Sequence, residues 1–110
     1  MIRATLTEIE ERIRRNTALA EASKNELLGL LSSLRSQLEE LSAVKGEHAE
    51  SIAGFIERSA HEATRKERDP ALLKLSLDGL AASVREVEQS HPRLVKEVNY
   101  ISTILANMGI

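Results

Sequence analysis

The sequence lacks cysteine and tryptophan, and its 110 residues include only two aromatic side chains, Phe55 and Tyr100. The absence of cysteine excludes disulfides and thiolate metal sites. With so few aromatic residues, a hydrophobic core must be built from Leu, Ile, Val and Ala. Only two prolines and five glycines interrupt the chain, and this composition favours helices over sheets.

A strong excess of one charge is also missing. The chain has 15 basic and 17 acidic residues and a formal net charge of −2, so it has no general electrostatic attraction to nucleic acid or to an anionic membrane. No apolar run approaches the length of a membrane span, and the N-terminal residues do not resemble a signal peptide. We therefore expect one cytoplasmic helical domain over residues 1–110, with neither nucleic acid nor membrane as a partner.

The apolar residues that are present recur at steps of three and four, which is typical of helices that bury one face. This spacing predicts a first helix from Ile2 to about Asn16, followed by a turn to Ala22. Ser23 and Glu26 have the spacing of a capping box, in which each side chain accepts a hydrogen bond from the other residue's backbone N–H. A second helix is expected to start there.

The second helix has the strongest pattern in the chain. Five leucines follow one another at heptad spacing, and further apolar residues widen the stripe they form. We interpret these five as tentative interaction residues: Leu27, Leu31, Leu34, Leu38 and Leu41.

The pattern is interrupted at Gly46. Either the second helix ends near Val44 and another begins near Glu47, or one long helix bends there. One glycine costs a helix only about 1 kcal/mol, so both alternatives are open, although a break or kink is favoured.

Two later helices have clear start signals. Asp69 and Pro70 are suited to the cap and the first position of a fourth helix, and Pro92 to the first turn of a fifth, with Ser90 or His91 as its cap. The fifth helix is expected to end in a Schellman motif formed by Gly109 and Ile110. Its apolar stripe consists of Leu94, Val98, Ile101, Leu105 and Met108. Together these patterns predict an all-α fold, an antiparallel bundle of four or five helices with coiled-coil-like heptad stripes.

No residue combination predicts catalysis, cofactor binding or a metal site. His61 and Glu62 begin like the zinc-binding HExxH motif, but Arg65 stands where the second histidine is needed. Glu88 and His91 have the Glu-x-x-His spacing of di-iron bundles, which require two such motifs and two more carboxylates.

The basic run Arg12 to Arg15 is interpreted as a solvated face. Each arginine follows an acidic residue by four positions, an order that stabilises a helix through side-chain pairing. The acidic residues are Glu8, Glu10 and Glu11.

The leading hypothesis is a non-enzymatic interaction module that self-associates, with a dimer as the first expectation, or binds an unidentified protein. Apolar stripes left uncovered in a monomer would serve as the interface. The alternative is a small all-α enzyme in which helix-borne basic residues bind an anionic metabolite. The arginines available for that role fall outside the apolar stripes: Arg12, Arg14, Arg15, Arg35 and Arg85.

The end of the chain, Ser90-His91-Pro92 through Asn107-Met108-Gly109-Ile110, resembles a family of short bacterial helical proteins, the domain of unknown function 4404. Residues 26–41 look like the second helix of this family, and Ile2 to Ile13 like its first. Residues 42–68 look like additional helix. The resemblance implies a small helical bacterial protein and brings no activity, ligand or catalytic residue.

Overall fold

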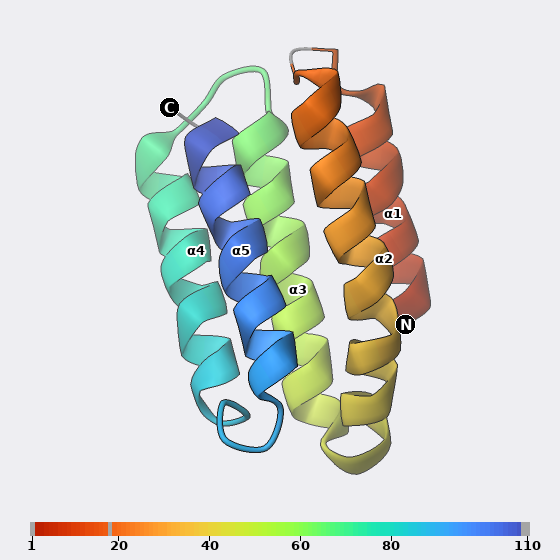
Figure 1. The fold of residues 1–110 in the computed structure, drawn as a ribbon. Helices are drawn as coiled ribbons and strands as arrows, with labels where there is room; N and C mark the ends of the chain where they lie inside the picture. The colour runs from red at the N-terminus through yellow and green to blue at the C-terminus, as the bar shows by residue number, and fades with distance from the viewer. Residues whose placement is uncertain (1, 18, 109–110) are drawn as a thin grey trace.

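The structure, a computed structural model, describes residues 2–17 and 19–108. Within them the chain forms five helices and no strand, which confirms the all-α prediction. The helices lie side by side along the longest dimension of a 37 × 25 × 22 Å molecule, and successive helices run in opposite directions (Figure 1). Their bounds are α1 Ile2–Arg15, α2 Glu21–Val44, α3 Gly46–Thr64, α4 Pro70–Arg85 and α5 Pro92–Met108.

Helix α3 is the centre of the bundle, because it contacts each of the other four helices. Its buried face is rich in small residues, which let neighbouring helices approach closely. Ile52 and Ile56 add bulk among these small side chains, and both are fully buried. The small buried residues of α3 are Ala49, Ala53, Ser59, Ala60 and Ala63.

The predicted capping box at the start of α2 is wrong. The helix begins at Glu21, with extended backbone at Ala20 and no side-chain cap, so Ser23 already lies inside the first turn. Glu21 and Ala22 are good helix formers and extend the helix toward the N-terminus. In the preceding turn, the Asn16 side chain instead accepts a hydrogen bond from the Leu19 N–H at 3.1 Å.

The chain breaks between α2 and α3, as the favoured alternative predicted, and the break is a single residue. Lys45 has φ −142° and ψ 68°, whereas Gly46 is the first residue of α3. The Lys45 N–H donates to the Leu41 carbonyl, and the Lys45 carbonyl accepts from the Ala49 N–H. One residue therefore closes one helix and opens the next.

The starts of α4 and α5 agree with the sequence signals. Asp69 Oδ1 accepts hydrogen bonds from the N–H groups of Ala71 and Leu72 at 3.1 and 3.2 Å, and Pro70 occupies the first turn. Helix α5 begins at Pro92. The expected Schellman motif at Gly109 and Ile110 lies outside the described residues. The apolar stripe of α5 faces the core, with Leu94, Val98, Ile101 and Leu105 buried and Met108 packed at its edge.

Candidate functional site

The five α2 leucines predicted to form an interface lie in the core of the bundle. None is more than 1% exposed, and all belong to one hydrophobic cluster to which every helix contributes. Because the neighbouring helices of the same chain cover this stripe, a contact with another protein has to use other residues. The interpretation is therefore revised for Leu27, Leu31, Leu34, Leu38 and Leu41.

Among residues 2–17 and 19–108, four large apolar side chains remain on the surface. Val44 is 71% exposed at the end of α2, Leu75 is 67% exposed on α4, Tyr100 is 51% exposed on α5 and Phe55 is 38% exposed on α3. Tyr100 is therefore accessible for a contact with another molecule. None of the four belongs to the cluster of buried core residues.

Tyr100 lies at an open hollow of roughly 550 Å³ on the face formed by α2 and α5. Leu30 of α2 contributes a half-buried apolar side chain that packs against the core. The remaining lining residues all come from α5: Pro92, Arg93, Lys96 and Glu97. The hollow thus combines apolar side chains with both signs of charge.

The Glu97 carboxylate is hydrogen-bonded by the side-chain amide of Gln37. This contact ties α5 to α2 and fixes the acidic group at the hollow. Arg93 and Lys96 are exposed, and no ion pair to either is found within the described part of the chain. Both cations are therefore available to a group from outside.

Helices α3 and α4 form the most extensive helix pair. The Phe55 ring covers Gly79 so closely that a Cβ on the glycine would lie 2.3 Å from the ring atom Cε1. One turn after Phe55 in α3 and one turn before Gly79 in α4, Ser59 and Ser76 are buried. The Ser76 hydroxyl donates to the Leu72 carbonyl at 2.9 Å, whereas the Ser59 hydroxyl has no hydrogen-bond partner among the described residues.

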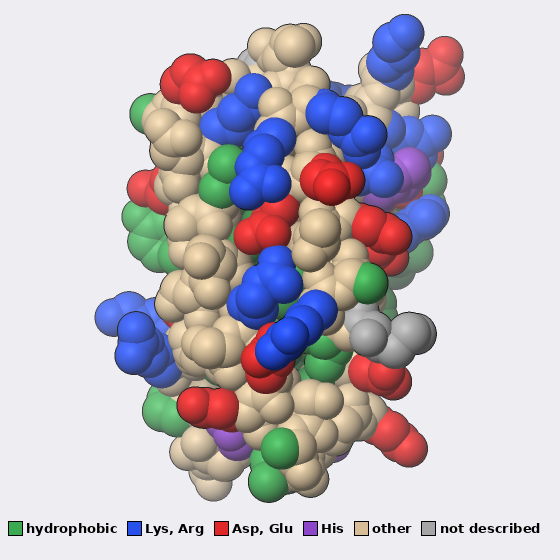
Figure 2. Space-filling model, turned by 90° about the vertical axis from the view of Figure 1, so that its right-hand side faces the viewer, with side chains coloured by type: hydrophobic (Ala, Val, Ile, Leu, Met, Phe, Trp, Pro, Cys, Tyr) green, Lys and Arg blue, Asp and Glu red, His purple; other side chains and the backbone are tan. Residues whose placement is uncertain are grey.

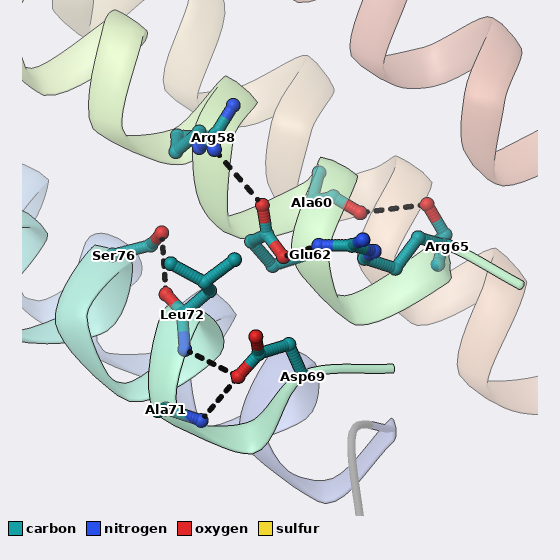
Figure 3. A network of polar contacts seen from close by, with 9 residues as sticks. Arg58, Ala60, Glu62, Arg65, Asp69, Ala71, Leu72 and Ser76 are labelled. Carbon is teal, nitrogen blue, oxygen red and sulfur yellow. Dashed lines mark hydrogen bonds and ion pairs between the residues drawn. The ribbon is translucent and has the colours of Figure 1, made fainter. Parts of the chain in front are cut away.

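A buried carboxylate lies near the end of the contact between α3 and α4 (Figure 3). Glu62 is 1% exposed, and its two oxygens point to arginines on either side. Oε1 lies 2.8 Å from an Arg65 nitrogen, and Oε2 lies 3.2 Å from an Arg58 nitrogen. The hydrogen bond to Glu62 raises the pKa of Arg65. A buried charge is tolerated when paired in this way, so the network has a structural explanation.

The two motif-like segments make local contacts. In the HExxH-like segment, Arg65 occupies the position of the second histidine and forms an ion pair with Glu62. Ser90 Oγ lies 2.9 Å from His91 Nδ1, and the same hydroxyl contacts the Val87 carbonyl. Across residues 2–17 and 19–108, no group of three or more His, Cys, Asp or Glu residues could hold a metal ion.

The face formed by α1 and α2 carries interleaved charges, with blue and red side chains alternating along the molecule (Figure 2). Two ion pairs join these helices: Arg3 to Glu39 at 2.6 Å and Arg35 to Glu10 at 2.8 Å. Glu10 therefore pairs across to α2 and not with Arg14, its expected partner along α1. The hydrogen bond from Arg3 holds the pKa of Glu39 below its ordinary range.

Two features escaped the sequence analysis although each has a signal. Ser59 follows Phe55 by four residues, and Glu62 follows Ser59 by three. This spacing places all three on the α3 face toward α4. On α5, the residues of the hollow are spaced at i, i+3, i+4 and i+7 along one face: Arg93, Lys96, Glu97 and Tyr100.

These observations define the class of the protein: a five-helix all-α bundle whose described residues form a closed core and an ion-paired surface. The chain belongs to the family called domain of unknown function 4404, whose model matches residues 27–110. The matched region includes residues 42–68, which the resemblance had set apart as additional, and it leaves out α1.

No curated protein and no solved structure matches the chain. Among the described residues, no helix has the length and apolar character needed to cross a membrane.

Proposed function

We propose that the protein is a non-enzymatic helical interaction module of the cytoplasm, which self-associates or binds another protein through exposed apolar side chains on its helices. One observation carries this proposal: the core is complete, yet Val44, Leu75 and Tyr100 are each more than half exposed. Exposed large apolar residues beyond the needs of the core are typical of contact surfaces.

Three of the arginines are already paired within the chain, which counts against these three as binders of an anionic metabolite. Arg35 is occupied by Glu10, and Arg58 and Arg65 are occupied by Glu62. Cations already paired within the chain would have to lose these partners in order to bind an anion.

The test is the absolute mass in solution, measured by light scattering behind a size-exclusion column over a range of concentrations. We expect the mass to rise above the 12.2 kDa of one chain. A mass that stays at that value, together with a melting temperature raised by an anionic metabolite, would replace the interaction module with a ligand-binding protein.

A further inference from the structure

We propose that the exposed face of α5 is a self-association surface whose occupant is α5 of a second copy of this chain, related by a two-fold axis. This inference rests on the proposed function and names its interface. It is carried by the order of four side chains along one helix face: Arg93, Lys96, Glu97 and Tyr100.

The four residues have the spacing i, i+3, i+4 and i+7, which places them on one face of a helix within about two turns. Their midpoint lies between Lys96 and Glu97. A two-fold axis through that midpoint, perpendicular to the helix, sets two copies of α5 antiparallel. An interface of this kind uses the same patch on both subunits, so each contact occurs twice.

Antiparallel alignment about this axis brings complementary groups together. Lys96 of one copy faces Glu97 of the other, and each pair forms twice. Arg93 faces the ring of Tyr100 in the other copy, where a guanidinium is attracted to the aromatic face. Every charged member of the face therefore finds an opposite charge or an aromatic ring, and no like charges are opposed.

The surroundings of this face support such an occupant. Leu30 supplies an apolar floor beside Tyr100 in the hollow. The hydrogen bond from Gln37 fixes Glu97 before any contact forms, which reduces the ordering that association requires. Arg93, Lys96 and Tyr100 are exposed in the single chain and available to the second copy.

One helix face is smaller than the roughly 800 Å² per partner of a standard stable interface. We therefore expect a reversible dimer, populated as the concentration rises. Because its ion pairs lie at the surface, added salt should weaken it.

The test uses two charge reversals in the full chain, with sedimentation equilibrium as the measurement. In the Lys96→Glu variant, a glutamate at position 96 faces Glu97 of the other copy, so two negative charges meet. In the Glu97→Lys variant, a lysine at position 97 faces Lys96 of the other copy, so two positive charges meet. We expect each single variant to raise the dimer dissociation constant by at least about tenfold. An equimolar mixture of the two variants restores both pairs, so we expect a heterodimer close to the unaltered chain in affinity. Tyr100→Ala should weaken the dimer by a similar factor.

Two controls separate the interface from changes within one chain. Lys74→Glu makes the same charge reversal on the exposed face of α4, outside the proposed surface, and should leave the dissociation constant unchanged. Gln37→Ala removes the hydrogen bond to Glu97 and keeps all four members of the α5 face, so the dimer should persist with a smaller loss of affinity than in Lys96→Glu. Circular dichroism confirms that each variant is folded.

The possible results distinguish failure of the α5 interface from failure of self-association as such. A dimer that survives Lys96→Glu and Tyr100→Ala but is lost in Leu75→Ser overturns the α5 interface and leaves the proposed function standing. Failure of the mixed variants to form heterodimers also overturns the interface. A single-chain mass at every concentration overturns both the interface and self-association.

Discussion

The ring of Phe55 lies directly over Gly79, and this contact sets how closely α3 and α4 approach. A Cβ built on Gly79 would be 2.3 Å from Phe55 Cε1 and 2.7 Å from Cδ1, well inside van der Waals contact. By contrast, a Cβ at Gly54 of α3 would meet nothing within 4 Å. The two glycines therefore differ in role although both lie inside helices.

Gly79→Ala should lower the free energy of unfolding by about 1 kcal/mol, because displacement of the Phe55 ring outweighs the gain in helix propensity. Gly54→Ala should instead raise it by up to about 1 kcal/mol. Urea denaturation measures both changes. If Gly79→Ala is as stabilising as Gly54→Ala, the close contact with Phe55 is contradicted.

Loss of Arg65 should destabilise the protein because Glu62 would keep a buried charge with one fewer partner. We expect Arg65→Ala to lower the free energy of unfolding. Arg58→Ala, at the more exposed partner, should change it by less than about 0.5 kcal/mol. Adding Glu62→Leu to Arg65→Ala removes the buried charge and should recover part of the loss. No recovery in that double variant would argue against buried charge as the cause.

The pair between Arg3 and Glu39 predicts a small pH dependence of stability. The pKa of Glu39 is lowered in the folded chain, chiefly by the hydrogen bond from Arg3. Its contribution is therefore present above the ordinary glutamate pKa and is lost as the pH falls through the lowered value. Titration followed by NMR should show the Glu39 pKa returning toward its ordinary value in Arg3→Ala. An unchanged pKa in that variant would show that Arg3 does not bind Glu39 in solution.

Substitution of an α2 leucine should reduce stability without changing assembly. Leu38 is fully buried, and Leu38→Ala should lower the free energy of unfolding by about 2–5 kcal/mol. The mass of the folded protein should equal that of the unaltered chain at the same concentration. Leu75→Ala, at an exposed position, should change stability by less than about 0.5 kcal/mol. A lower mass with unchanged stability in Leu38→Ala would place this leucine in an interface.

Sequence periodicity was sufficient for the helices because it reflects local physics. The apolar spacing, the cap at Asp69 and the prolines at positions 70 and 92 act within a few residues of themselves, so the bundle and most helix limits followed from them. The start of α2 was missed because Glu21 and Ala22 continue the helix beyond the capping box predicted at Ser23. The break at Lys45 was located only to within two residues.

The sequence by itself determined the helical class, the apolar stripes and the absence of thiol chemistry. Only the tertiary structure decided which stripes are covered, since burial depends on neighbours distant in sequence. It enclosed the α2 leucines with helices of the same chain, buried Glu62 between Arg58 and Arg65, and left Tyr100 on the surface. Periodicity identifies a face of a helix, whereas the packing of other helices determines whether that face belongs to the core or is open to a second molecule.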